Sequence, residues 1–141
     1  MIVYFDTSAL IKLVFDEPGS EIAVELWDRA EAVASSQLVY PEARAAAAAA
    51  HRGGRIDAGT LRSATREIDE LFDELTVIGL DDPLARSAGR LAQQRALRGY
   101  DAVHLASALT VDAEDLVVAT WDRDLADAAI AEALAVAPAP S

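Results

Sequence analysis

Short apolar runs alternate along this chain with longer stretches in which apolar positions recur at helical spacing. Ile2–Phe5 is a short run rich in β-branched and aromatic residues, and it ends at an aspartate. Thr60–Glu74 instead places its apolar residues three and four positions apart, which predicts an amphipathic helix. The same two patterns alternate over the rest of the chain and predict five strands and seven helices.

The predicted strands are Ile2–Phe5, Ala32–Ser35, Thr76–Leu80, Leu116–Ala119 and Leu134–Ala137. The predicted helices are Thr7–Phe15, Ser20–Glu31, Pro41–His51, Thr60–Glu74, Asp82–Leu97, Asp101–Val111 and Arg123–Leu134.

Alternation of strands and helices is typical of the α/β class, in which helices cover a central, mostly parallel sheet. The strand runs are continuously apolar, as expected for strands buried on both faces. A length of 141 residues fits one domain, and no linker or repeat divides the chain. We therefore expect one domain over residues 1–137, with a short frayed tail at residues 138–141.

Composition excludes several kinds of chemistry. The chain has no Cys, so disulfides, Cys-based zinc sites and a Cys nucleophile are all excluded. Its 24 acidic and 12 basic residues leave a net charge of -12, which argues against a broadly basic nucleic-acid coat. The N-terminus has no basic targeting region, and the apolar runs fall far short of the ~20 residues that span a membrane. We therefore expect a soluble, cytoplasmic protein.

Carboxylates stand at four predicted strand ends or helix starts. Asp6 directly follows the first strand, and Glu42 lies in the first turn of the helix after the second. Asp101 opens a helix, and Asp122 follows the fourth strand, with Asp124 two residues further on. Ligands of open parallel sheets bind beyond the carboxyl ends of the strands, so these acids could form one cluster.

Each acid also has a simpler interpretation as a helix cap or a first-turn acid that complements the helix dipole. A true cluster of carboxylates would instead repel itself unless it bound a cation or stayed partly protonated. Oxygen ligands without Cys and with little His suit Mg²⁺ or Mn²⁺. Such an ion is a common device of phosphate chemistry.

Two basic segments interrupt the overall negative charge. The segment Ala43–Arg66 contains five Arg and one acid, and Arg86–Arg98 contains four Arg and no acid. Their arginines, among them Arg44 and Arg98, could position an anionic polymer beside the acids. The alternative is that they are solvated side chains on exposed helix faces.

Four short motifs follow one another along the chain: Asp6-Thr-Ser-Ala-Leu, Pro41-Glu42, Tyr100-Asp101-Ala-Val-His-Leu-Ala and Thr120-Trp-Asp122-Arg-Asp-Leu. In this order and at these separations the motifs resemble those of the PIN domain, and more narrowly those of VapC-type toxins of bacterial toxin–antitoxin pairs. The resemblance covers nearly the whole chain, from Ile2 to about Ala129.

This resemblance implies a single α/β/α domain and an endoribonuclease that depends on Mg²⁺ or Mn²⁺. The family's acidic quartet would fall on Asp6, Glu42, Asp101 and Asp122, and its small hydroxyl residue on Ser8. Asp124 would be an outer or substitute acid. A VapB-type antitoxin and a homodimeric state are implied as well.

Taken together, the residues and the resemblance lead to one expected mechanism. Asp6, Asp101 and Asp122 hold one or two metal ions, directly or through water, and Glu42 orients the water that attacks an RNA phosphodiester. Ser8 supports the metal site or a phosphate oxygen. Arginines of the basic segments position the RNA backbone.

Three alternatives remain beside this mechanism. A phosphatase of the haloacid dehalogenase type also starts with a strand and an Asp, but it needs a second Asp where this chain has Ser8. A catalytically silent interaction module would keep the fold and bind only a partner. A Ser/His/Asp hydrolase lacks the required nucleophile motif, and His104 is interpreted as a structural residue within a helical pattern. His51 is interpreted as a helix C-terminal or RNA contact.

Overall fold

The computed structural model describes residues 1–139, and within that range it contains seven helices and five strands, as predicted. The strands are β1 (Ile2–Phe5), β2 (Ala32–Ser36), β3 (Thr76–Ile78), β4 (Leu116–Ala119) and β5 (Ala135–Ala137). The helices are α1 (Thr7–Val14), α2 (Ser20–Arg29), α3 (Val39–Arg52), α4 (Ala58–Glu74), α5 (Asp82–Arg95), α6 (Gly99–Leu109) and α7 (Arg123–Ala131).

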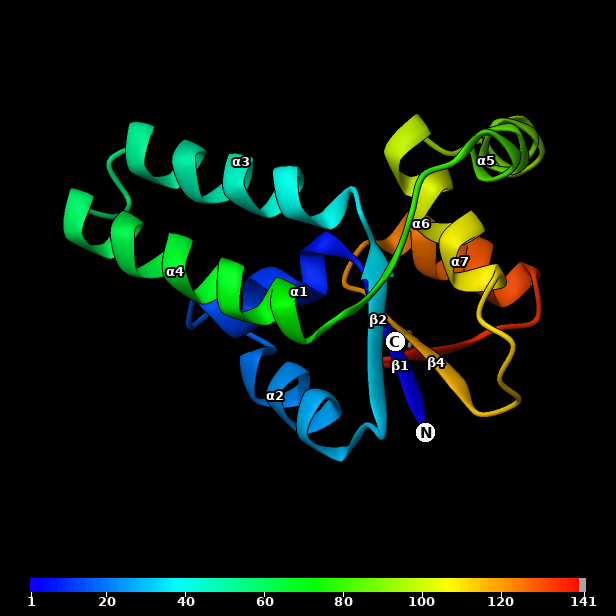
Figure 1. The fold of residues 1–141 in the computed structure, drawn as a ribbon, viewed down its shortest axis with the longest axis horizontal. Coiled ribbons are helices and arrows are strands. Elements are labelled where there is room, and N and C mark those ends of the chain that lie inside the picture. Colours follow the sequence, from blue (N-terminus) through cyan, green and yellow to red (C-terminus); the bar gives the residue numbers. More distant parts are fainter. Residues whose placement is uncertain (140–141) are drawn as a thin grey trace.

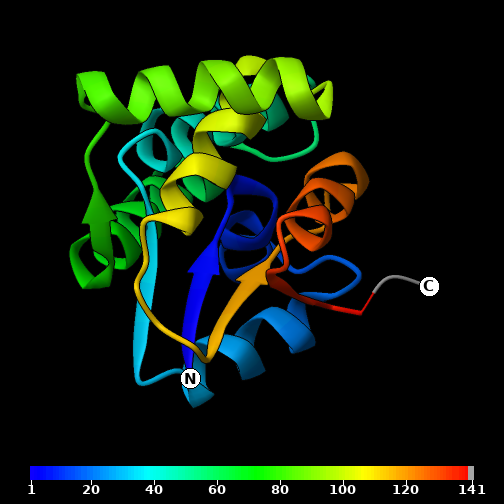
Figure 2. The same ribbon diagram turned by 90° about the vertical axis from the view of Figure 1, so that its right-hand side faces the viewer.

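The five strands form one sheet in the order β3-β2-β1-β4-β5, and every neighbouring pair is parallel. The chain builds outward from β1 through β2 to β3, and then crosses to the other side of β1 to add β4 and β5. The order therefore reverses between β1 and β4, which Figure 2 shows side by side with their arrowheads pointing the same way. This reversal is where an open α/β sheet binds its ligand.

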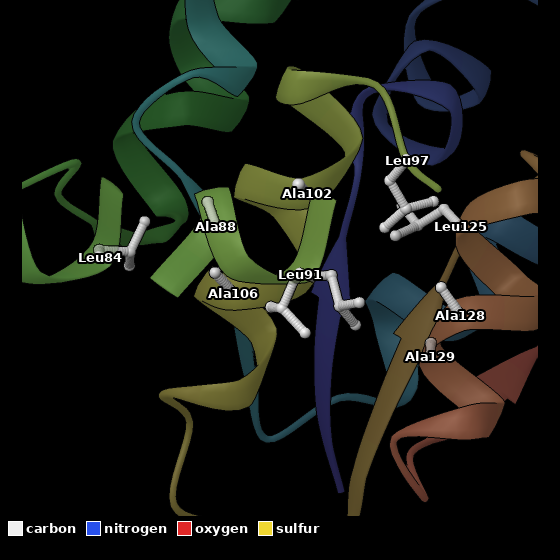
Figure 3. Close-up of a cluster of buried hydrophobic side chains, with 10 residues drawn as sticks. Leu84, Ala88, Leu91, Leu97, Ala102, Ala106, Leu125, Ala128 and Ala129 are labelled. Atoms are coloured by element: carbon white, nitrogen blue, oxygen red, sulfur yellow. The ribbon is translucent and has the colours of Figure 1, made fainter. Parts of the chain in front are cut away.

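Helices cover both faces of the sheet. Figure 1 shows α1 to α4 on one side of the strands and α5 to α7 on the other. The α5–α7 side is closed by small and branched residues of these three helices, among them Leu91 and Leu125, together with Leu97 from the connection between α5 and α6 (Figure 3). The other side packs Leu10, Ile68 and their neighbours between α1, α3 and α4. The α/β class predicted from the sequence is confirmed.

Strand β1 is central and sends alternate side chains to the two faces. Val3 and Phe5 pack with Ala9 on the α1 and α2 side, whereas Tyr4 packs on the opposite face with Ala108 of α6. All three strand residues are fully buried. The alternation places the Tyr4 hydroxyl under α6, at the level where the strand ends and Asp6 follows.

Several predicted boundaries differ by one to a few residues from the structure. Helix α3 begins at Val39, so Pro41 is its third residue rather than its first. A proline is tolerated there because the first-turn N–H groups have no partner within the helix. Helix α6 begins at Gly99, so Asp101 lies within its first turn. Strand β3 ends at Ile78 instead of Leu80, and it and β5 are partly exposed because they are the sheet edges.

The structure describes residues 138 and 139 of the expected tail, and residues 140–141 lie outside the described residues. No helix within residues 1–139 is long and apolar enough to cross a membrane.

Gly19 provides a test of how the α1–α2 connection supports the end of β4. Its φ is +97°, and a Cβ added there would lie 2.8 Å from the indole nitrogen of Trp121. We expect Gly19→Ala to lower the free energy of unfolding by about 1–2 kcal/mol from the backbone conformation alone, and by more from the clash. Urea denaturation monitored by circular dichroism measures this.

The matched control is Gly89→Ala, because Gly89 lies in α5 and has open space where its Cβ would be. There the substitution should raise the free energy of unfolding by about 0.5–1 kcal/mol. Equal effects at the two glycines would contradict the packing described for Gly19.

Candidate active site

The buried carboxylate of Asp6 lies where the strand order reverses. Its backbone N–H donates to the carbonyl of Ala119 at 3.3 Å, so the chain of β1 is still paired with β4 at this point. Asp6 is only 3% exposed. Its side chain caps α1 by accepting from the N–H of Ala9 at 2.9 Å. The sequence-predicted position of Asp6, directly beyond β1 and at a helix start, is thus observed.

Two hydroxyls also donate to Asp6. Ser8 Oγ donates to Oδ1 at 2.7 Å, and Thr120 Oγ1 donates to Oδ2 at 2.5 Å. Burial raises the pKa of Asp6, and the electrostatic effect of nearby His104 together with these hydrogen bonds offsets only part of that rise. Asp6 is therefore a desolvated carboxylate whose ionised form depends on its donors.

The same two hydroxyls tie the β4 end to Asp6. Ser8 Oγ accepts from the N–H of Trp121 at 2.9 Å, and Thr120 Oγ1 accepts from the N–H of Asp122 at 3.0 Å. Asp122 in turn caps α7, because its Oδ1 accepts from the N–H of Leu125 at 3.0 Å. The sequence motif around Asp122 is thus fixed to the first motif by side-chain hydroxyls.

Asp101 and Asp122 are held together by an arginine. Arg98 Nε donates to Oδ2 of Asp101 at 3.1 Å, and Arg98 Nη2 donates to Oδ2 of Asp122 at 3.1 Å. Burial raises the pKa of Asp101, the charge of Asp122 raises it further, and Arg98 partly opposes both. Arg98 itself is well exposed and stacks over the ring of Tyr100. An acidic pair is therefore bridged by a solvent-accessible cation.

Glu42 is held by hydrogen bonds with Thr7 and His104, and His104 is itself held by Tyr4. Its Oε1 accepts from Thr7 Oγ1 at 2.6 Å and lies 2.8 Å from Nε2 of His104. The other ring nitrogen of His104, Nδ1, lies 2.8 Å from the hydroxyl of Tyr4. Burial raises the pKa of Glu42, but the hydrogen bonds from His104 and Thr7 outweigh it, so the net pKa is lowered. Glu42 is therefore ionised at neutral pH.

Sequence reasoning missed three residues that contact the acids, namely Thr7, His104 and Thr120, and also Tyr4, which contacts His104. The interpretation of His104 as a structural residue agrees with its 2% exposure, but its ring also reaches Glu42. A signal was present, because His104 lies three residues after Asp101 and so shares a face of α6 with it. Tyr4 gave no such signal, since its partner is 100 residues away along the chain.

Two of the candidate residues lie further from this cluster. Asp124 is exposed and lines a separate hollow with Gln94 and Arg95 at the end of α5. Arg44 is also exposed and donates to the hydroxyl of Tyr40 at 2.6 Å, beside the start of α3.

The donor set suits a hard divalent cation, because it consists of carboxylate and hydroxyl oxygens. Arg98 already places a positive charge between Asp101 and Asp122. Within residues 1–139, however, no group of three or more His, Cys, Asp or Glu side chains has the geometry to hold an ion. The residues therefore fit a cation held by one or two carboxylates and completed by water, which is the usual way that Mg²⁺ binds.

Comparisons with known proteins identify the class of this fold and site. The sequence profile of the PIN domain matches residues 3–131. Ribonuclease VapC45 of Mycobacterium tuberculosis is 47% identical over 138 residues, which make up 98% of this chain and 96% of the relative. The chain therefore belongs to the PIN-domain family. Its similarity to a VapC ribonuclease over nearly the full length makes it a VapC-type member.

Solved structures agree with this assignment. PAE2754 from Pyrobaculum aerophilum is 28% identical to this chain and superimposes with a TM-score of 0.68. The match covers 91% of this chain and 79% of PAE2754. A toxin–antitoxin complex from Klebsiella pneumoniae contains a chain that is 22% identical, with coverage of 88% and 90% and a TM-score of 0.65. The second likeness shows the fold alone. The family match excludes the alternative of a haloacid-dehalogenase-type phosphatase.

Thr120 offers a test of how the site is held. We expect Thr120→Val to lower the free energy of unfolding by about 1–3 kcal/mol, because buried Asp6 loses a donor and the Asp122 N–H loses its acceptor. Thr120→Ser keeps the hydroxyl and should cost about 1 kcal/mol or less for the lost methyl group. Urea denaturation in the presence of EDTA compares the two variants. A Val variant as stable as the Ser variant would contradict this role of the hydroxyl.

Proposed function

We propose that this protein is a cytoplasmic, metal-dependent endoribonuclease and the toxin of a toxin–antitoxin pair. The observation that carries the proposal is the gathering of Asp6, Asp101 and Asp122 around the reversal point between β1 and β4, with Glu42 attached through His104. The ribonuclease name of the 47% identical relative supports the substrate class.

In this proposal Mg²⁺ or Mn²⁺ would be held by Asp101 and Asp122, and Asp6, whose two oxygens already accept hydrogen bonds, would join through water. When bound, the ion supplies charge neutralisation at the phosphate and lowers the pKa of a bound water. Arg98 pairs with the same two carboxylates, so it would compete with a cation for their oxygens. Its exposure and its stacking on Tyr100 leave it room to contact an RNA phosphate instead.

The chain's own residues hold the attacking water and the substrate. Ionised Glu42 accepts a proton from the water and orients it toward the phosphorus. In-line attack forms a bond from the water oxygen to phosphorus and breaks the P–O3′ bond, and O3′ takes a proton from solvent, so that the product strands carry a 5′-phosphate and a 3′-hydroxyl. Ser8 and Thr120 keep Asp6 ionised and fixed, and Asp124 supports the site from outside the cluster. Arg44 and Arg98 bind the RNA backbone.

The first test is cleavage of an end-labelled RNA pool by the purified chain with Mg²⁺, with Mn²⁺ or with EDTA. We expect cleavage that needs the metal and that falls at least about 100-fold in Asp101→Asn, because the neutral amide neither holds the cation nor keeps the charge of the cluster. The charge-matched control is Asp28→Asn, because Asp28 is an exposed residue of α2. This variant should cleave like the wild type.

An Asp101→Asn variant with full activity would overturn the assignment of the site. Absence of both cleavage and Mn²⁺ binding in the wild type, measured by calorimetry, would favour the silent interaction module. Asp6→Asn is a useful second variant because its amide can donate to Thr120 Oγ1 while Oδ1 still caps α1, so it should fold and be inactive.

The proposed partner is a VapB-type antitoxin, and the proposed toxin acts as a homodimer. The name of the structurally similar Klebsiella pneumoniae complex agrees with such a pairing. We expect induced expression of this chain alone to arrest bacterial growth, and co-expression with its neighbouring antitoxin gene to restore it. The Asp101→Asn variant should be harmless alone. Growth arrest by that variant would show that toxicity does not come from the site.

A further inference from the structure

The Tyr4–His104–Glu42 chain is a buried line of hydrogen bonds from the middle of β1 to the edge of the acidic cluster. Tyr4 is fully buried and His104 is 2% exposed. The two rings meet edge to face, with centroids 5.9 Å apart and planes inclined at 78°. No buried side-chain nitrogen or oxygen within residues 1–139 lacks a hydrogen-bond partner, so the chain is fully satisfied.

The direction of these hydrogen bonds follows from the two ends of the chain. Glu42 is ionised and can only accept, so Nε2 of His104 carries a proton and donates to Oε1. The phenol hydroxyl of Tyr4 carries its proton at neutral pH and donates it to Nδ1, which lies 2.8 Å away. Tyr4 thus selects the tautomer of His104 that carries its proton on Nε2.

The consequence for Glu42 is an asymmetric carboxylate. Oε1 accepts from both His104 and Thr7, whereas no residue within 1–139 donates a hydrogen bond to Oε2. The Glu42 side chain is 22% exposed, so Oε2 can be reached by water. Two donors on one oxygen leave the other as the atom that can take a proton from a water molecule.

We propose that His104, with its tautomer set by Tyr4, is the positioning residue that aims Glu42 Oε2 at the attacking water. This inference rests on the proposed ribonuclease function. His104 touches neither RNA nor metal in this role, and it acts only through the orientation and ionisation of Glu42.

The kinetic test compares three variants with the wild type. His104→Leu removes the donor and should lower kcat about 10- to 100-fold with KM unchanged, as expected for loss of a supporting hydrogen bond at a catalytic group. His104→Gln places an amide N–H near the former Nε2 and should recover most of that loss. Tyr4→Phe removes only the hydroxyl and should lower kcat about 3- to 10-fold.

The control for simple loss of stability is Leu105→Ala, because Leu105 lies beside His104 on α6 but packs into the hydrophobic cluster away from Glu42. At a temperature where all variants are folded by circular dichroism, its kcat should stay within about two-fold of the wild type. Equal losses in His104→Leu, His104→Gln and Leu105→Ala would assign His104 to packing and overturn the proposal.

A spectroscopic readout tests the same arrangement without activity. The imidazole nitrogens of His104 in a long-range ¹H–¹⁵N NMR spectrum should show a protonated Nε2, and Tyr4→Phe should shift the Nδ1 resonance. A proton on Nδ1 alone in the wild type would overturn the proposal. If the tautomer is as expected but the wild type cuts no RNA, the proposed function has failed while the hydrogen-bond chain stands.

Discussion

The burial of an aspartate at the end of the central strand is the constraint on which the rest of the site depends. An isolated carboxylate of this kind would be costly to remove from water, and the raised pKa of Asp6 reflects that cost. Three donors offset it, and they come from both sides of the β1–β4 reversal: Ser8 and Ala9 from α1, and Thr120 from the end of β4. Placing Asp6 therefore also fixes the loop that carries Asp122. The fold and the site are joined at one carboxylate.

Much of the fold follows from pattern alone, because short continuously apolar runs predict buried strands and apolar residues three and four positions apart predict amphipathic helices. The order of the strands does not follow from pattern, since it depends on which side of β1 each crossover falls. The boundary of α3 was wrong by two residues because a proline can occupy any position of a first turn. The predicted end of β3 was wrong because the pairing with β2 stops at Ile78, so Gly79 and Leu80 have no strand partner.

The positions of the candidate acids could be predicted from the sequence, but several of the residues that contact them could not. Strand ends and helix starts are local features, and parallel strands bring their carboxyl ends to one edge. The contacts of Tyr4 with His104 and of Thr120 with Asp6 join residues 100 and 114 positions apart, so they depend on the register of the whole sheet. Thr7 could not be predicted either, because nothing in the sequence distinguishes it from an ordinary residue at the start of a helix.

The simpler interpretation of the acids as helix caps and the catalytic interpretation are compatible, because a carboxylate has two oxygens. Asp122 uses Oδ1 to cap α7 and turns Oδ2 to Arg98. Glu42 has both its donors on Oε1, and Asp101 meets Arg98 through Oδ2. Anchoring one oxygen removes the rotational freedom of the side chain before any ligand arrives, so less entropy is lost on binding. Asp6 differs, since both its oxygens already accept hydrogen bonds. It is therefore suited to fixing the cluster, while Glu42, Asp101 and Asp122 keep oxygens that can exchange partners.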